Sequence, residues 1–288
     1  MHYNEKAMAP SQTQMMTRPI PVSGELLPVI GLGTFSTFDI GDDAATRGRL
    51  TEVLRLFFAR GGRMIDSSPM YGRAEAVVGD LLATLRPRET PFLATKVWTT
   101  GREEGIEQMK RSATLLRTPA LDLIQIHNLV DWRTQLATLR RMKEAGQVRY
   151  LGITHYTSAA LPALAEILAH EQVDFVQLGY SIAEREAESR VLPLAVERGV
   201  GVIVNLPFRS GTLMSRVRKA TLPPWAADFD CASWAEFLLK FIVSHPAVTC
   251  VIPATANPAH MADNLAAGFG RLPGEAERRR MVKLWESV

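Results

Sequence analysis

Eight short apolar runs constrain the fold of this chain more than any other feature. They recur at intervals of roughly 25 to 30 residues and are rich in Val, Ile and Leu without strict alternation with polar residues. Such continuous apolarity is typical of strands that are buried on both faces. The runs read LPVIGLGTF, RMID, PFLATKV, LDLIQIH, VRYLGIT, VDFVQLGY, VGVIVNLP and VTCVIPA.

Each run is followed by a segment with apolar residues three and four positions apart, the spacing of an amphipathic helix. Strict alternation of strand and helix predicts a parallel sheet covered by helices. With eight units and no break in composition, we predict the closed (β/α)8 TIM barrel, an α/β fold, rather than an open doubly wound sheet. An open dinucleotide-binding sheet would also need Gly-x-Gly-x-x-Gly, whereas residues 31–36 read GLGTFS and lack the third glycine.

Four segments fall outside the repeating pattern. Residues 1–18 are expected to form a disordered leader, followed by a single barrel domain over residues 19–288. The stretch TRPIPVSGELLP predicts an N-terminal hairpin that turns at Ser23-Gly24 and caps the barrel floor, and EAERRRMVKLWESV predicts an extra C-terminal helix. Residues 209–230 are long and contain Gly, paired Pro and Trp, which predicts a functional loop or lid.

Composition and charge exclude several classes of protein. The net charge is only +3 and basic residues are interspersed with acidic ones, so we expect no nucleic-acid partner; ERRRMVK is interpreted as an exposed face of the last helix. No apolar run approaches about 18 residues, so no membrane-spanning helix is expected. The start lacks the apolar core of a secretory signal, and the cytoplasm is the expected compartment. Cys231 and Cys250 do not make a disulfide framework, and we predict no metal site.

Three polar residues lie at the C-terminal ends of consecutive apolar runs. Asp66 ends RMID, Lys96 lies near the end of PFLATKV, and His127 ends LDLIQIH. In a (β/α)8 barrel these strand ends converge on one rim, where reactive groups gather. Each residue alone has an ordinary explanation as a turn residue, a solvated cation or a structural histidine. Their coincidence on neighbouring strands, with Tyr71 in the loop after Asp66, predicts a catalytic site.

These four side chains suit the delivery of a proton. A free tyrosine has a pKa near 10, which is high for acid-base chemistry near neutral pH. A nearby Lys96 ammonium is expected to lower the pKa of Tyr71, while Asp66 keeps Lys96 charged and oriented. His127 is expected to hydrogen-bond a substrate oxygen beside Tyr71. The site is then built to protonate a developing alkoxide.

The chain resembles the aldo-keto reductase superfamily over about residues 19–268. The resemblance rests on eight motifs in the order of the family: GLGTF, IDSSPMYG, LATK, LDLIQIH, GQVRYLGIT, VDFVQLGY, LPFRSGTL and VIPATANPAHMADN. It implies a barrel that reduces carbonyls with a nicotinamide cofactor. Carried over to this sequence, Tyr71 is the general acid, Lys96 modulates its pKa, Asp66 is the partner of Lys96, and His127 orients the substrate.

The cofactor side departs from the family pattern at two strand ends. The usual Ser-Asn pair after the fifth strand is Thr154-His155 here, whereas Gln177 matches the glutamine that binds the nicotinamide carboxamide. The aromatic residue that commonly stacks on the nicotinamide is replaced by Asn205-Leu206. Stacking is then expected to be lost or supplied from elsewhere, with Trp225 in the long loop as one candidate.

The end of the barrel departs as well. The Lys-Ser pair and the arginine that suit the 2′-phosphate of NADPH align with Ala254, Thr255 and His260. Asp263 and Asn264 match the residues that contact adenine. NADPH is the predicted cofactor, with NADH left open. The full set of predicted cofactor-binding residues is Gly33, Thr34, Asp66, Thr154, His155, Gln177, Asn205, Leu206, Pro207, Phe208, Gly211, Leu213, Pro253, Ala254, Thr255, His260, Asp263 and Asn264.

The leading hypothesis is therefore a carbonyl reductase that converts an aldehyde or ketone to an alcohol, and the resemblance to the family implies a monomer. One alternative is an aldolase in which Lys96 forms a Schiff base with the substrate. Another is a regulatory barrel that binds the cofactor but turns over weakly. The substrate walls are expected to be apolar or aromatic. Candidate wall residues are Phe35, Phe38, Trp98, Trp132, Phe208 and Trp225.

Overall fold

Eight parallel strands form a nearly closed barrel in the computed structural model, which describes residues 14–288. Hydrogen-bonded neighbours follow the order of the sequence, and parallel bridges from Ile30 to Val251 and from Gly33 to Ala254 bring the last strand against the first. The predicted (β/α)8 barrel is confirmed. Its strands are β3 (Leu32–Gly33), β4 (Met64–Asp66), β5 (Phe92–Val97), β6 (Leu121–His127), β7 (Val148–His155), β8 (Phe175–Gly179), β9 (Gly201–Asn205) and β10 (Val248–Val251).

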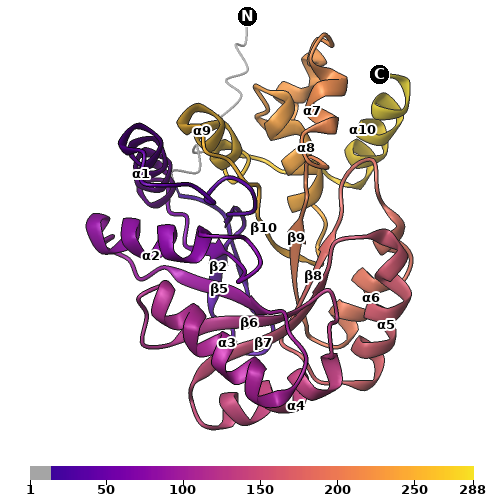
Figure 1. The fold of residues 1–288 in the computed structure, drawn as a ribbon. Helices are drawn as coiled ribbons and strands as arrows, with labels where there is room; N and C mark the ends of the chain where they lie inside the picture. The colour runs from indigo at the N-terminus through magenta and orange to yellow at the C-terminus, as the bar shows by residue number, and fades with distance from the viewer. Residues whose placement is uncertain (1–13) are drawn as a thin grey trace, which may run out of the picture.

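Helices surround the strands on the outside of the barrel (Figure 1). Their apolar faces cover the outward-facing strand residues, which together form the larger of two hydrophobic clusters. The helices that follow the strands are α1 (Ala44–Ala59), α2 (Ala74–Leu85), α3 (Arg102–Leu115), α4 (Trp132–Glu144), α5 (Leu161–His170), α6 (Val191–Glu197), α8 (Trp234–Val243) and α9 (Pro258–Ala266).

The barrel interior changes from apolar to polar along each strand. Phe92 and Ala94 on β5 belong to the interior hydrophobic cluster, and Lys96 follows two residues later on the same side of the strand. Leu123 on β6 is likewise interior and is followed by Gln125 and His127. Apolar layers therefore fill the N-terminal half of the barrel, and a polar layer lies at the C-terminal ends.

The N-terminal hairpin is confirmed, and it packs at the floor of the barrel. Its strands β1 (Thr17–Pro19) and β2 (Leu26–Pro28) pair antiparallel, with Gly24 at φ +76° in the turn. Tyr150 donates a 2.7 Å hydrogen bond from its hydroxyl to Ser23. Of the leader predicted over residues 1–18, residues 1–13 lie outside the described residues, while Thr17 and Arg18 already belong to the hairpin.

The extra C-terminal helix is also confirmed, as α10 (Glu275–Ser287). It is not an entirely exposed basic face, as ERRRMVK predicts, because Arg278 is inserted between elements. Its guanidinium donates to the Tyr180 hydroxyl at 2.7 Å and pairs with Glu188 at 3.0 Å, while it stacks 4.1 Å from the ring centre of Phe241 on α8. These contacts dock α10 onto the barrel.

The segment over residues 209–230 is not an extended loop. It folds into α7 (Thr212–Val217) and a 3₁₀ helix (Pro224–Phe229). Trp225 lies 5.6 Å from the ring of Phe237 and 4.2 Å below the Arg280 guanidinium. Trp225 therefore packs this segment onto α8 and α10, and the paired prolines lie at the start of the 3₁₀ helix.

Candidate active site

A cavity of about 830 Å³ opens at the C-terminal ends of the strands. It is lined by residues from the loops after nearly every strand, as expected for the mouth of a (β/α)8 barrel. Tyr71 and His127 reach its wall directly, and Asp66 forms part of its base. Lys96 lies beneath Asp66 and is fully buried.

Asp66 and Lys96 form a buried ion pair at the base of the cavity. The Lys96 ammonium lies 2.5 Å from Oδ2 of Asp66 and also donates to the Ser67 carbonyl at 2.7 Å. Both side chains are almost fully shielded from solvent, at 0% and 3% exposure. Burial acts to lower the pKa of Lys96, but Asp66 and Tyr71 hold it above the ordinary value. Lys96 is therefore a fixed cation under the reaction site.

Tyr71 stands over this pair on a short loop. The Lys96 ammonium lies 4.9 Å from the centre of the Tyr71 ring, and the ring of His127 lies 5.8 Å from it at 84°. The backbone turns sharply at Gly72, whose φ is +59°; a Cβ there would lie 2.4 Å from the Asp39 carboxylate. Glycine after Tyr71 is thus required by the turn that presents the phenol to the cavity.

The pKa of Tyr71 moves in the direction opposite to the prediction. Burial of the phenol is the largest influence and raises its pKa, while Lys96 lowers it and Asp66 raises it further. The net pKa is above the ordinary value. The negative charge of Asp66 largely compensates the positive charge of Lys96. Lys96 therefore reduces the rise in the pKa of Tyr71 that burial causes, but does not reverse it. Tyr71 therefore holds its proton throughout the neutral pH range.

His127 is a neutral imidazole in this site. Burial, the Lys96 charge and His155 lower its pKa from 6.5 to about 3. Its Nδ1 lies 3.0 Å from the Ser68 hydroxyl. The ring is only 6% exposed, yet His127 lines the cavity next to Tyr71. The arrangement places a hydrogen-bonding nitrogen beside the phenol.

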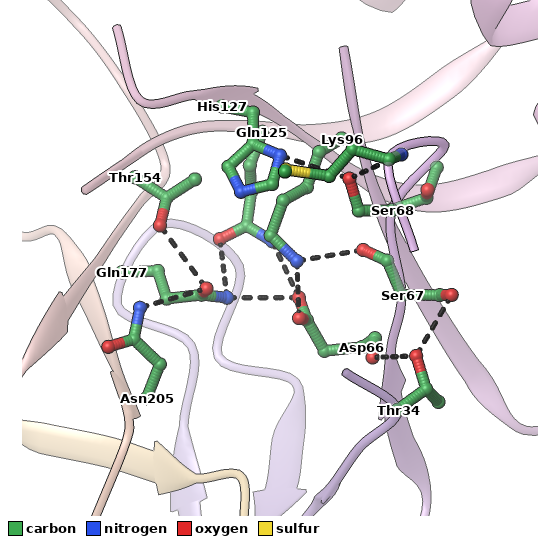
Figure 2. A network of polar contacts seen from close by, with 12 residues as sticks. Thr34, Asp66, Ser67, Ser68, Lys96, Gln125, His127, Thr154, Gln177 and Asn205 are labelled. Carbon is green, nitrogen blue, oxygen red and sulfur yellow. Dashed lines mark hydrogen bonds and ion pairs between the residues drawn. The ribbon is translucent and has the colours of Figure 1, made fainter. Parts of the chain in front are cut away.

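A network of amides connects this ion pair to the other side of the barrel (Figure 2). Gln125 and Gln177 donate to Oδ1 of Asp66 at 2.8 and 2.9 Å, so the carboxylate has partners on both oxygens. The carbonyl oxygen of Gln177 accepts from Thr154 and from Asn205, both at 3.2 Å. Sequence reasoning missed Gln125, although it precedes His127 by two residues and therefore faces the same side of β6.

One buried acceptor in this network has no partner among residues 14–288. Oδ1 of Asn205 is shielded from solvent and makes no hydrogen bond there, while the Nδ2 group of the same side chain is tied to Gln177. A buried acceptor without a partner is costly, so this oxygen leaves a hydrogen bond to be completed. Asn205 lines the cavity, and its free oxygen together with Thr154 and Gln177 fits an amide group such as the nicotinamide carboxamide.

Most predicted cofactor residues lie around the cavity, but three do not. His155 faces away from it and stacks on Tyr156 at 5.5 Å, because successive strand residues point to opposite sides and Thr154 takes the inward position. Leu213 is buried in the core, and Pro253 is held at the barrel seam, where its carbonyl accepts from Gly33. The predicted residues that line the cavity are Gly33, Thr34, Asp66, Thr154, Gln177, Asn205, Leu206, Pro207, Phe208, Gly211, Ala254, Thr255, His260, Asp263 and Asn264.

The predicted aromatic walls are only partly present. Phe35 and Phe208 line the cavity, whereas Phe38 is fully buried in the core and Trp225 packs on Phe237. Trp225 therefore does not replace the missing stacking residue, and Trp98 and Trp132 are likewise absent from the lining. Further residues of the lining belong to rim loops that the sequence predicted only as ranges (36–43, 128–132 and 209–230), namely Ser36, Thr37, Asn128, Ser210 and Met214, whereas Met70, Tyr156, Ala235 and Ile252 were not predicted. Met70, Tyr156 and Ile252 lie shortly after strand ends, which is a signal that could have indicated them, whereas Ala235 lies at the start of α8 and has no such signal.

The far end of the cavity carries little positive charge. Among the described residues that line it there is no lysine or arginine, and His260 on α9 is the one basic side chain at that end. Asp263 accepts a 2.6 Å hydrogen bond from the Ser233 hydroxyl, which links α9 to the start of α8. Within the described part of the chain, no cluster of three or more His, Cys, Asp or Glu side chains suits a metal ion.

Comparison with known proteins agrees with this geometry. The family model described as the Aldo/keto reductase family matches residues 29–279. The chain is a member of the aldo/keto reductase family. The predicted family is confirmed, and with it the expectation of an oxidoreductase that depends on a nicotinamide cofactor.

Relatives of this aldo/keto reductase include two enzymes of Escherichia coli K12. Methylglyoxal reductase YeaE is 30% identical over 260 residues, which cover 88% of this chain and 89% of the relative. The NADH-specific methylglyoxal reductase is 26% identical over 258 residues, which cover 78% of this chain and 77% of the relative. An aldo-keto reductase from Klebsiella pneumoniae in complex with NADPH has the same fold, with a TM-score of 0.77 and 24% identity. The match covers 94% of this chain and 96% of the Klebsiella chain.

In residues 14–288, every helix of this aldo/keto reductase is too short or too polar to span a bilayer.

Proposed function

We propose that this aldo/keto reductase reduces an aldehyde or ketone to the alcohol, with Tyr71 as the general acid. The observation that carries the proposal is the stack of Asp66, Lys96 and Tyr71 at one side of the cavity, with His127 beside the phenol. A bound nicotinamide cofactor supplies the hydride that reduces the carbonyl carbon. Tyr71 supplies the proton to the carbonyl oxygen, and His127 donates a hydrogen bond that orients this oxygen.

The protonation states of the site support this assignment. Tyr71 has a raised pKa and is a phenol at neutral pH, so its proton is available before the reaction begins. Lys96 is a permanent cation next to the ring, and it stabilises the phenolate that forms when the proton leaves. Asp66 compensates the Lys96 charge in the resting site and is held by two amides, so this pair stays in place during the reaction.

NADPH is the proposed cofactor, and the residues at the cavity base fit its nicotinamide end. Gln177 and Thr154 present polar groups there, and the free Oδ1 of Asn205 is proposed to accept from the carboxamide amine. On β7, His155 stands where the family usually has an asparagine, and it faces away from the cavity. On β9, Asn205 stands where the family usually has a stacking aromatic residue. The side-chain amide that the family supplies from β7 is therefore proposed to come from Asn205 on β9. His260 is the one basic lining residue proposed to meet the 2′-phosphate.

A small neutral carbonyl compound is the proposed substrate. Phe35 packs on the Tyr71 ring, Met70 and Tyr156 also line the cavity, and the described lining holds no lysine or arginine that would pair with a substrate carboxylate. Two of the relatives are methylglyoxal reductases, so methylglyoxal is the first compound to test. Neutral 2-oxoaldehydes and aromatic aldehydes are expected to be reduced faster than carbonyl acids of the same size.

The aldolase alternative is not favoured by the site. An amine nucleophile needs a free lone pair and access to the substrate. Lys96 is 0% exposed, donates to Asp66 and Ser67, and has a raised pKa. Borohydride trapping should therefore leave Lys96 unmodified in the presence of any carbonyl compound.

The test of the proposed function is the oxidation of NADPH in the presence of a carbonyl panel that includes methylglyoxal. We expect loss of NADPH absorbance with at least the neutral aldehydes, together with formation of the alcohol. Tight binding of NADPH without oxidation by any member of the panel would instead support the regulatory barrel.

A further inference from the structure

We propose that Ser68 is a positioning residue that fixes the tautomer of His127, so that Nε2 carries the proton and donates into the cavity. The tautomer of His127 is a property of the protein itself; only its expected effect on catalysis rests on the proposed function. Ser68 lies two residues after Asp66 and three before Tyr71, in the loop that presents the phenol. None of the roles assigned above uses its hydroxyl.

The hydrogen bonds of Ser68 determine which way the proton points. Its hydroxyl oxygen accepts from the backbone amide of Met70 at 3.3 Å and lies 3.0 Å from Nδ1 of His127. The Ser68 side chain is 0% exposed. A hydroxyl has one proton to donate, and within the described residues Nδ1 of His127 is the one acceptor in reach of it.

The opposite direction would leave a buried proton without a partner. If Nδ1 carried the hydrogen, the Ser68 oxygen would accept from both Met70 and His127, and its own proton would have no acceptor among residues 14–288. Burying an unsatisfied donor is unfavourable. The Ser68 hydroxyl therefore donates to Nδ1, and a neutral His127 must then hold its one proton on Nε2. Figure 2 shows Ser68 and His127 joined by this bond.

The position of His127 makes this choice matter for the reaction. Nε2 makes no hydrogen bond to any described residue, and His127 lines the cavity beside Tyr71. Because the low pKa keeps the ring neutral, only one nitrogen is a donor at a time. With the Nε2–H tautomer, His127 donates to a carbonyl oxygen; with the other tautomer it would present a lone pair and repel that oxygen.

Ser68 contacts both His127 and the turn that carries Tyr71. The Ser68 carbonyl accepts from the backbone amide of Tyr71 at 3.0 Å, so one residue anchors the turn under Tyr71 and faces the ring of His127. Loss of the hydroxyl alone leaves this backbone bond in place. A Ser68→Ala change is therefore expected to alter the histidine without displacing Tyr71.

The test is ¹⁵N NMR of the protein labelled at histidine, recorded for the wild type, Ser68→Ala and Ser68→Thr, with His127 assigned from a His127→Gln spectrum. We expect nitrogen shifts of a neutral Nε2–H imidazole in the wild type, a mixture of tautomers in Ser68→Ala, and recovery in Ser68→Thr, which keeps the hydroxyl. In parallel, kcat for carbonyl reduction should fall about tenfold in Ser68→Ala, with an unchanged Kd for NADPH, and return in Ser68→Thr.

A matched control is Ser67→Ala, which removes a neighbouring buried hydroxyl that accepts from Thr34 and makes no hydrogen bond to His127. It should leave the His127 nitrogen shifts unchanged. A wild-type Nδ1–H tautomer, or a Ser68→Ala protein with unaltered His127 shifts, would overturn the proposal. If the shifts behave as expected but no carbonyl is reduced by the wild type, the tautomer assignment stands and the proposed function fails.

Discussion

The two halves of the cavity are held in different ways. On the side of Asp66 and Lys96, the reactive groups are fixed by short contacts from β4, β5, β6 and β8, and both oxygens of the carboxylate are satisfied. On the side of α9, the lining groups come from loops and helix ends, and His260 is the one basic residue. The proton-delivering half is thus built into the barrel strands, whereas the half proposed to hold the dinucleotide depends on loops and on α9.

Removal of the proton donor should have the largest effect. Tyr71→Phe keeps the ring that packs on Phe35 but loses the hydroxyl. We expect kcat for reduction to fall by about 10³-fold or more, in line with general acid catalysis, and the Kd for NADPH to change less than twofold. Steady-state rates measure the change in kcat, and a fluorescence titration measures the Kd for NADPH. Wild-type rates in this variant would rule out Tyr71 as the acid.

Disruption of the buried pair of Asp66 and Lys96 should have the next largest effect, and this effect is on the stability of the protein. Asp66→Asn leaves the Lys96 ammonium buried without its carboxylate, which is expected to cost about 3–5 kcal/mol in the free energy of unfolding. Urea denaturation measures this loss. Glu107→Gln is a control, because it breaks an exposed pair with Lys110 and should change stability by less than about 0.5 kcal/mol. Similar losses in the two variants would contradict the assignment of a fixed pair.

The neutral histidine predicts a dependence of stability on pH. Because the pKa of His127 is about 3 in the folded state and near 6.5 in the unfolded chain, the unfolded state binds more protons between these values. Stability from this group is therefore complete above pH 6.5 and falls as the pH drops towards 3. We expect the wild type to lose about 2–3 kcal/mol more than His127→Gln between pH 7 and pH 4. Parallel curves for the two proteins would show that His127 titrates normally.

The smallest effect is expected on the loop-built half. His260→Arg places a permanent cation at the end of the cavity that is proposed to meet the 2′-phosphate. Affinity for NADPH should rise about tenfold, with little change for NADH, since one charge-assisted contact is gained. Equal gains for the two cofactors would place the 2′-phosphate elsewhere.

The sequence predicted the barrel and the residues at the early strand ends well, and for the same reason. Apolar runs with a fixed spacing specify strands, and a residue at or next to the C-terminal end of such a strand must lie near one end of the barrel, as Asp66, Lys96 and His127 do. Orientation within a strand end was harder, because a shift of one residue exchanges inward and outward positions. Thr154 and His155 are both predicted to bind the cofactor, but of the two Thr154 alone takes the inward position that lines the cavity.

Other features depend on tertiary structure that no local pattern contains. Trp225 was a candidate wall residue, but its ring is packed between Phe237 and Arg280, which come from distant parts of the chain. The pKa of Tyr71 was expected to be lowered by Lys96, but burial by the whole barrel mouth outweighs one cation. The Ser68 contact with His127 likewise joins two strand ends 59 residues apart in sequence.

The central claim is that a hydride and the Tyr71 proton reach the same carbonyl in this cavity. A single-turnover experiment with NADPH deuterated at the transferred C4 position, mixed with methylglyoxal, tests it most directly. We predict rapid oxidation of the bound cofactor by the wild type, deuterium on the former carbonyl carbon of the product, and a rate at least about 10³-fold lower in Tyr71→Phe at equal occupancy. Product without deuterium, or equal rates in the two proteins, would contradict the account.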